Sequence, residues 1–253
     1  IGMVDNWIPH ENKIFDKFLN DYFGNSCSSF ITLSKSVANE IKLNFSKPIL
    51  KGFHPINEFL PVPISKVEAR KNLNLSSNAS YILFFGLIRK YKGLDLLIDA
   101  FSIYQKKNKN AYLLIVGEFY ENKNKYLRLI NNLGLENKVL LYPEFMDFDQ
   151  ARNFFCASDC VAQTYRSASQ SGVTPVAYHY GLPILVSNLN GLIKPIKNDD
   201  SGIITEINST SIAKGLNEIF QPKTLKKFRK NIQSSRSNYS WKKFNQQMIH
   251  FIE

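Results

Sequence analysis

The chain has 253 residues, 44% hydrophobic and 13% aromatic, enough for one large domain or for one domain with part of another. No apolar run in this sequence approaches the roughly 18 residues needed to span a bilayer. The first residues, 1–6, lack the basic and apolar regions of a signal peptide. The formal net charge of +11 favours an anionic partner, such as a nucleotide diphosphate, a nucleic acid or an acidic membrane surface.

The distribution of lysines and cysteines narrows these classes. Lysines are spread along the chain, as in 108–110 and 121–125, and form no long basic block, which is typical of a solvated surface and gives little support to nucleic-acid binding. The three cysteines cannot all pair, and their spacing matches no zinc motif. Cys156 and Cys160 lie in an apolar stretch, as small core residues do. We therefore expect a reducing, cytoplasmic environment and no bound metal.

The first part of the chain predicts a separate small unit. Its expected elements are the end of a buried strand at 1–6, a helix over 12–23, a strand over 29–33, and a helix from the N-cap Ser34 to Leu43. The proline-rich stretch 53–63 then predicts a hinge or linker.

Strands and helices alternate through the rest of the chain. We expect strands over 80–85, 111–116, 139–142, 160–163, 184–186 and 202–204, and helices over 94–104, 126–133, 150–157, 173–180, 222–232 and 241–252. This alternation predicts an α/β fold, a doubly wound Rossmann-like parallel sheet with helices on both faces. Such a sheet binds its ligand beyond the carboxyl ends of the strands, where Gly86, Gly117, Pro143, Tyr165 and Ser187 fall.

The loop from Phe85 to Asp95 is the first candidate site. It follows a strand, carries Arg89 and Lys92, and precedes a helix that opens at Gly93. Cations and free backbone N–H groups at a helix start can bind a diphosphate. An ordinary solvated loop would have similar residues, and both interpretations stay open here. The segment matches neither a P-loop nor a GxGxxG fingerprint, which weighs against kinases and dehydrogenases.

The segment from Tyr165 to Val173 is the second candidate. Small hydroxyl residues lie between a strand end and a helix start, where a ligand can approach the backbone and an anion is favoured. Gly191, after the next strand, could act in the same way. Helix capping by Ser169 or Ser171 would use the same residue types.

The histidines and carboxylates carry less information. His10 and His54 follow expected strand ends, near the cleft or hinge, whereas His179 and His250 fall on helices and read as structural. The carboxylates Glu118, Asp95 and Glu144 have no partner at a spacing typical of a hydrolase, and no Gly-x-Ser-x-Gly elbow or metal cluster occurs.

Several of these segments together resemble the group 1 glycosyltransferases, family four, with the GT-B fold. The resemblance rests on Phe85 to Phe101, Leu114 to Glu118, Ala157 to Cys160, Gly181 to Ser187 and Ser240-Trp241, and covers roughly residues 51–253. The segments Tyr165 to Gly172 and Asn6 to Glu11 resemble a branch of bacterial polysaccharide-building enzymes. The resemblance implies retaining transfer of a sugar from a nucleoside diphosphate donor to an acceptor hydroxyl, without a metal or other cofactor.

The resemblance also implies roles for individual residues. Arg89 and Lys92 match the family's diphosphate-binding cations, and with His10 they are the predicted catalytic residues. The predicted donor-binding residues are Gly86, Gly117, Glu118, Glu144, Phe145, Met146, Ser169, Gln170, Ser171, Gly172 and Val173. Residues 144–146 match the loop that holds the nucleobase.

The chain departs from the family pattern at two glutamates. The second would fall at Val176 and the first near Ala168 to Gln170, and neither carboxylate is present. Gln170 could replace the first through hydrogen bonds. Leu87 also stands where the family has an arginine, and we expect Arg89 to supply that charge.

The resemblance divides the chain into four expected parts. These are a remnant of an N-terminal acceptor domain over 1–50, a hinge over 51–63, a nucleotide-sugar donor-binding domain over 64–236, and a C-terminal crossover helix over 237–253. We expect the apolar face of the last helix, with Phe244, Met248 and Phe251, to be exposed or paired with another chain. We also expect this chain alone to be inactive.

The function that the sequence predicts is donor binding for a hexosyltransferase of cell-surface polysaccharide synthesis. Its partners would be a nucleotide-sugar donor and a saccharide or lipid-linked acceptor, with no nucleic acid, in the cytoplasm or at the inner face of the membrane. The alternatives left open are an inactive nucleotide-sugar-binding or scaffolding relative, and a phosphorylase or epimerase of the same fold.

Overall fold

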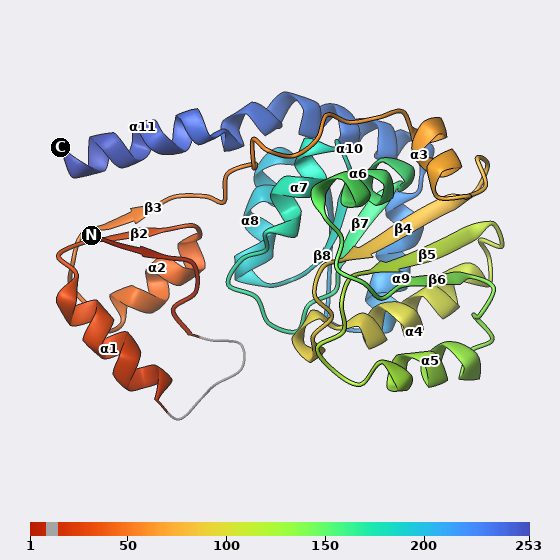
Figure 1. The fold of residues 1–253 in the computed structure, drawn as a ribbon, viewed down its shortest axis with the longest axis horizontal. Coiled ribbons are helices and arrows are strands. Elements are labelled where there is room, and N and C mark those ends of the chain that lie inside the picture. Colours follow the sequence, from red (N-terminus) through yellow and green to blue (C-terminus); the bar gives the residue numbers. More distant parts are fainter. Residues whose placement is uncertain (9–14) are drawn as a thin grey trace.

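Two parallel sheets organise the chain, and the structure, a computed structural model, describes residues 1–8 and 15–253. The smaller sheet has the strand order β1-β2-β3 and lies apart from the larger one, to which a single extended segment connects it (Figure 1). Its elements are β1 (Gly2–Val4), α1 (Asp16–Ser26), β2 (Phe30–Thr32), α2 (Lys35–Lys42) and β3 (Ile49–Lys51). Ser34 caps α2 by accepting from the Val37 amide, as predicted.

The larger sheet has six strands in the order β6-β5-β4-β7-β8-β9, all paired in parallel. The strands are β4 (Ser80–Phe85), β5 (Ala111–Val116), β6 (Val139–Tyr142), β7 (Cys160–Gln163), β8 (Ile184–Ser187) and β9 (Gly202–Thr205). The chain runs outward from β4 to β6 and then returns to β7 on the other side of β4. The strand order therefore reverses between β4 and β7, and a doubly wound sheet offers its ligand crevice at the carboxyl edge of such a point.

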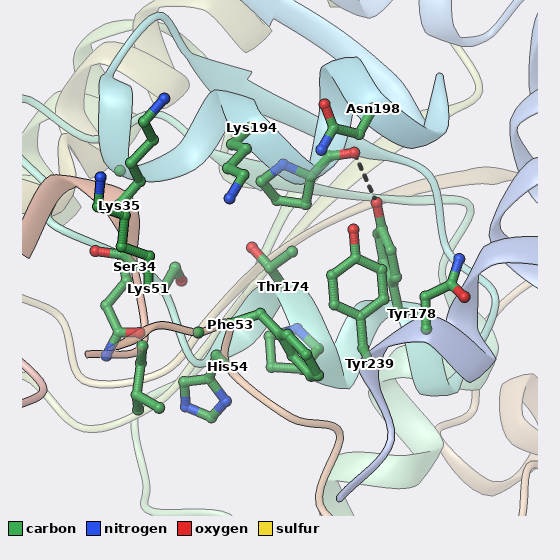
Figure 2. Close-up of a pocket in the computed structure, with 18 of the residues that line it drawn as sticks. Ser34, Lys35, Lys51, Phe53, His54, Thr174, Tyr178, Lys194, Asn198 and Tyr239 are labelled. Atoms are coloured by element: carbon green, nitrogen blue, oxygen red, sulfur yellow. Dashed lines mark hydrogen bonds between the residues drawn. The ribbon is translucent and has the colours of Figure 1, made fainter. Parts of the chain in front are cut away.

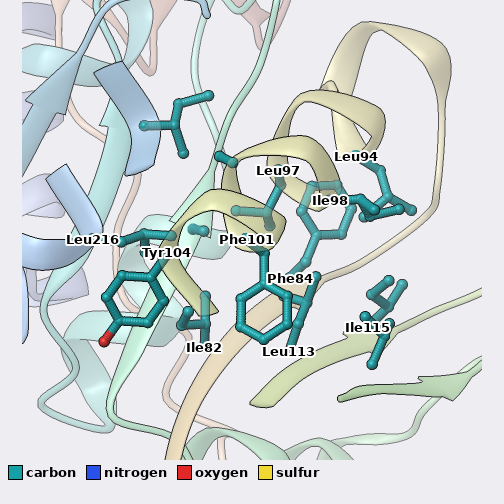
Figure 3. Close-up of a cluster of buried hydrophobic side chains, with 14 of the residues drawn as sticks. Ile82, Phe84, Leu94, Leu97, Ile98, Phe101, Tyr104, Leu113, Ile115 and Leu216 are labelled. Carbon is teal, nitrogen blue, oxygen red and sulfur yellow. The ribbon is translucent and has the colours of Figure 1, made fainter. Parts of the chain in front are cut away.

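Helices cover both faces of this sheet. The helices after β3 are α3 (Lys66–Asn72), α4 (Leu94–Gln105), α5 (Lys123–Asn132), α6 (Phe148–Ala157), α7 (Val173–His179), α8 (Asn190–Asp199), α9 (Ser209–Ile219), α10 (Pro222–Ser235) and α11 (Trp241–Ile252). The last of these, α11, extends away from the larger sheet toward the smaller one (Figure 1). Alternate β4 side chains enter opposite cores, because successive strand residues point to opposite faces. Ile82 and Phe84 pack with α4 and α9 (Figure 3), whereas Tyr81 and Leu83 pack with α6 and α7. The predicted doubly wound α/β fold is confirmed.

Most predicted elements of the larger unit match within three residues, but α3, α8 and α9 were not predicted. In the smaller sheet, β3 was not predicted. The helix α8 contains Pro195, which reads as a breaker in a sequence. The short α3 shows little periodicity, although Ser65 does cap it by accepting from the Glu68 amide. Among the described residues, no helix is long and apolar enough to cross a membrane.

The expectation for the last helix is wrong at Phe244. Its ring is fully buried rather than exposed, and it packs on Phe53 at 5.6 Å between centroids. Gly52 provides the necessary space, since a Cβ there would lie 2.8 Å from the Phe244 ring. The helix therefore starts against the segment that follows β3 (Figure 1), while Met248 and Phe251 stay half-buried.

A buried charge network holds the amino edge of the larger sheet together. Asp159, just before β7, accepts from Lys66 at 2.5 Å, from Arg70 at 3.0 Å and from the Tyr81 amide at 2.9 Å. Arg70 is only 5% exposed, so its charge depends on this carboxylate. The network joins α3 and β4 to the start of β7.

Replacing Asp159 should strongly destabilise the fold. We expect Asp159→Ala to lower the free energy of unfolding by about 3–5 kcal/mol, because it leaves the Arg70 charge buried and unpaired. Urea denaturation measures the change. The matched control is Asp149→Ala, where the carboxylate is exposed and the pair with Arg152 is superficial, so a change within about 0.5 kcal/mol is expected. Equal effects of the two substitutions would contradict the account.

Candidate functional site

Two glycines bring the loops after β4 and β5 into close contact. Gly86 has φ +99° and Gly117 has φ +135°, both in the region that favours glycine. A Cβ at Gly117 would lie 2.3 Å from the Gly86 carbonyl oxygen, so no side chain fits between the loops. Gly86 is half-buried and Gly117 is buried, so the two loops meet through their backbones at the carboxyl edge of the sheet.

Lys92 lies buried directly beside Gly86. It ends a 3₁₀ turn, Lys90–Lys92, and is 8% exposed. Its Nζ would lie 3.1 Å from a Cβ at Gly86 and is 5.8 Å from the centroid of the Tyr165 ring. Burial, and then the charge of Arg89, lower the pKa of Lys92 to about 8. Among the described residues no carboxylate forms an ion pair with it.

Arg89 occupies the same loop, with its guanidinium 4.6 Å from the centroid of the Tyr120 ring. This stacking directs a planar cation along the loop after β5. The two predicted cations therefore come from one short loop and are close enough to affect each other's charge. That loop lies at the crevice between β4 and β7.

The loop after β7 is bonded to the loop after β4, which sequence reasoning missed. Arg166 donates two hydrogen bonds to Asp95, at 2.8 and 2.7 Å, and its amide donates to the Tyr91 carbonyl at 2.7 Å. Thr164 Oγ1 donates to the Gly93 carbonyl at 3.0 Å. Although burial raises the pKa of Asp95, the hydrogen bonds and charge of Arg166 hold it below its usual value. The separation of 71 residues between Arg166 and Asp95 gives no local signal for this pair.

The turn over 168–173 makes contacts of two kinds. Ser169 is buried and donates to the side chain of Asn6, and Gln170 donates to Asp5, so both reach the end of the smaller sheet. Ser171 Oγ accepts from the Val173 amide at 3.3 Å, in a local cap of α7. Gly172 is exposed. The capping alternative thus describes Ser171, whereas Ser169 and Gln170 join the two units.

The loops after β5 and β6 form the open side of the crevice. Glu118 and Glu144 are exposed, and Phe145 has 73% of its surface accessible. Met146 is half-buried and packs against the core. The exposed ring of Phe145, next to Glu144 in the chain, offers a surface on which a planar ring can stack.

The remaining candidates are Gly191 and the histidines, of which His54 lies beside Gly172 and His10 is not described. A Cβ at Gly191 would lie 2.3 Å from the Ala168 carbonyl oxygen, so this glycine allows two loops to approach. His54 Nδ1 is 3.0 Å from the Pro55 carbonyl and His179 Nε2 is 2.9 Å from that of Pro61. His10 lies outside the described residues. Within residues 1–8 and 15–253, no three His, Cys, Asp or Glu side chains gather as a metal site would require.

A cavity of about 510 Å³ lies between the two units (Figure 2). Gln170 and Ser171 contribute to its lining, but Gly86, Arg89 and Lys92 do not. The cavity and the cation loop are therefore separate places, and both are adjacent to the turn over 168–173. The chemistry of the buried Lys92 identifies the cation loop as the candidate for the predicted ligand.

Comparison with known proteins adds a family and a fold. The family model of glycosyl transferases group 1 matches residues 65–235. An uncharacterized glycosyltransferase of Methanocaldococcus jannaschii is 28% identical over 212 residues, which cover 80% of this chain and 53% of that protein. The chain thus spans about half the length of this relative.

Solved structures of HepE from Anabaena have the same architecture. The complex with UDP superposes with a TM-score of 0.83 at 18% identity and covers 99% of this chain and 71% of HepE. The complex with UDP-glucose gives a TM-score of 0.82 at 19% identity, with the same coverage. The likeness confirms the expected α/β fold.

Removing the Arg166–Asp95 pair should loosen the loops after β4 and β7. We expect Arg166→Ala to speed amide hydrogen exchange at 89–93 and 166–172 by about tenfold, because a pair of charged hydrogen bonds is lost. Asp95→Ala should act equally, and the double variant should add little. Arg152→Ala, which breaks a pair remote from the crevice, is the control. Unchanged exchange in the Arg166 variant would show that the link does not hold the loops.

Proposed function

Because this chain belongs to the group 1 glycosyl transferases, we propose that its larger unit binds the nucleoside diphosphate sugar donor of a retaining hexosyltransferase. The acceptor is a hydroxyl of a saccharide or lipid-linked saccharide, in bacterial cell-surface polysaccharide synthesis. The smaller unit, residues 1–50, belongs to the acceptor side, and 51–63 form the hinge. We place the protein in the cytoplasm, where its net charge of +11 would draw it to an anionic inner membrane face.

The buried ammonium of Lys92 is the observation that carries this proposal. Burying a cation without a counter-ion is costly, and the cost is recovered when an anion binds beside it. A diphosphate at the crevice would supply that anion, next to the backbone of Gly86. Arg89 would then offset the charge that develops as the nucleoside diphosphate leaves. In this proposal the two cations supply the charge stabilisation, with no metal or other cofactor.

The neighbouring residues fit the rest of such a donor. The loop over 144–146 would hold the nucleobase, with Phe145 as the stacking surface. Gly117 and Glu118 would border the nucleoside, and the backbone of 171–173 would meet the phosphates and sugar. UDP and UDP-glucose in the similar HepE structures support a uridine nucleotide as the first donor to test.

The contacts of Ser169 and Gln170 favour a second candidate function. These residues stand near the place of a family glutamate, yet their side chains are bonded to Asn6 and Asp5. A protein with that arrangement could bind a nucleotide sugar without transferring it. Assays of sugar-nucleotide hydrolysis and of sugar transfer separate the two, since a binding relative would do neither.

Removing either cation should weaken UDP binding. We expect Lys92→Ala and Arg89→Ala to raise the dissociation constant for UDP by about tenfold to hundredfold, the effect of losing a charged hydrogen bond. Calorimetry on the 253-residue chain measures it. Lys90→Ala removes an exposed charge from the same loop and is the matched control. If wild type binds UDP no more tightly than the Lys92 and Arg89 variants, the assignment is wrong.

UDP affinity should also fall with rising pH. The pKa of Lys92, lowered by burial and by Arg89, is about 8, so its charge is lost as the pH passes that value. A bound diphosphate would raise the pKa of Lys92. The terminal phosphate of UDP, whose second pKa is about 6, is already fully ionised at pH values near the pKa of Lys92. Above the pKa of Lys92, we expect the affinity for UDP to decrease by up to about tenfold per pH unit. Calorimetry at about pH 7 and about pH 9.5 brackets the transition. In Lys92→Arg, whose charge persists, the decline should disappear; the same decline in that variant would exclude Lys92 as its source.

A further inference from the structure

The cavity between the two units is distinct from the cation loop and has its own chemistry. Its walls come from the starts of α2 and α8, the segment after β3, one side of α7, and α11. With a volume of about 510 Å³ it lies within the range of small-molecule sites. Figure 2 shows Lys35 and Lys51 on one side and Tyr178, Tyr239 and Asn198 on the other, with Lys194 between.

One end of the cavity concentrates positive charge. Lys35, Lys51 and Lys194 come from α2, β3 and α8, three segments that are distant in sequence. The charges of Lys42, Lys35 and Lys194 lower the pKa of Lys51, so these ammonium groups repel one another. A fourth lining lysine, Lys243, lies elsewhere in the wall and donates to Asn238 at 2.5 Å. In the described part of the chain, no carboxylate forms an ion pair with Lys35, Lys51 or Lys194. An anion here would relieve the repulsion.

Two helix starts add to this field. Ser34 and Lys35 at the start of α2, and Asn190 and Gly191 at the start of α8, line the same cavity. The amino end of a helix carries a partial positive charge and unsatisfied N–H groups. No side chain caps α8, although the backbone of Ala168 and Ser169 packs against Gly191 in its first turn. The lysines and both helix starts therefore favour the same kind of ligand.

The other end of the cavity is polar without excess positive charge. Asp199 accepts hydrogen bonds from Tyr178 at 2.9 Å and from Tyr239 at 2.5 Å. The amides of Asn198 and Gln247 lie in the same wall and are exposed. Amides and phenols of this kind bind hydroxyl groups. The cavity thus combines an anion-binding end with a hydroxyl-binding end.

We propose that this cavity binds a phosphorylated saccharide, with its phosphate between Lys35, Lys51 and Lys194 and its hydroxyl groups toward Asn198 and Gln247. The size and enclosure of the cavity fit a small molecule better than a membrane surface or a nucleic acid. The cavity is distinct from the cation loop, because neither Arg89 nor Lys92 lines it, although Ser171 borders both places. Binding there does not depend on sugar transfer.

Glucose 6-phosphate is the probe, titrated by calorimetry into the 253-residue chain already saturated with UDP. We expect one site in wild type and at least about tenfold weaker binding in Lys51→Ala/Lys194→Ala, from the loss of charged hydrogen bonds. Lys197→Ala, on the same helix but outside the lining, is the matched control. Lys194→Arg should retain binding. Thermal melts should show that the double variant stays folded, because it loses exposed charges that repel each other.

The donor and cavity proposals can fail separately. The double variant should bind UDP as wild type does, whereas Lys92→Ala should bind glucose 6-phosphate as wild type does. Displacement of UDP by glucose 6-phosphate would overturn the second site, and so would equal affinity in wild type and the double variant. Inorganic phosphate and glucose are titrated separately as further probes. Binding of inorganic phosphate as tight as that of glucose 6-phosphate would overturn the saccharide end of the proposal.

Discussion

The proposed donor site depends on one constraint, the burial of the Lys92 ammonium at the carboxyl edge of the larger sheet. The side chain is held beneath Gly86 and beside Tyr165, where water cannot solvate it fully and no described carboxylate pairs with it. The free protein therefore carries an electrostatic cost that an anion would remove. The link from Arg166 to Asp95 keeps the two loops that enclose Lys92 together. Rigid enclosure makes the cation a preorganised partner for a diphosphate.

The turn over 168–173 and the last helix connect the two units of the protein. Ser169 and Gln170 reach from the larger unit to Asn6 and Asp5, while Phe244 anchors the last helix on the segment after β3. The lysine-lined cavity lies beside the proposed donor site, and the turn over 168–173 borders both. A ligand in the cavity would touch both units, so its binding would also affect how they meet. In our proposals the larger unit binds the donor, and the cavity binds a second ligand.

The parallel sheet and its helices could be predicted from periodicity, because buried strands and amphipathic helices leave local patterns. The position of Lys92 also followed from its place after β4. Local patterns failed for α8, whose Pro195 obscures it, and for Phe244, whose burial depends on a distant aromatic ring. The Arg166–Asp95 pair and the lysine cavity could not be predicted, since their members are far apart in sequence and meet only in the folded chain.

The position of a bound uridine nucleotide tests the account most directly. A crystal structure of this chain with UDP would locate the diphosphate relative to both candidate sites. The account predicts phosphate oxygens within hydrogen-bond distance of Lys92 Nζ and close to the Gly86 backbone, with the base against the loop at 144–146. A diphosphate bound instead between Lys35, Lys51 and Lys194, with Lys92 untouched, would contradict it.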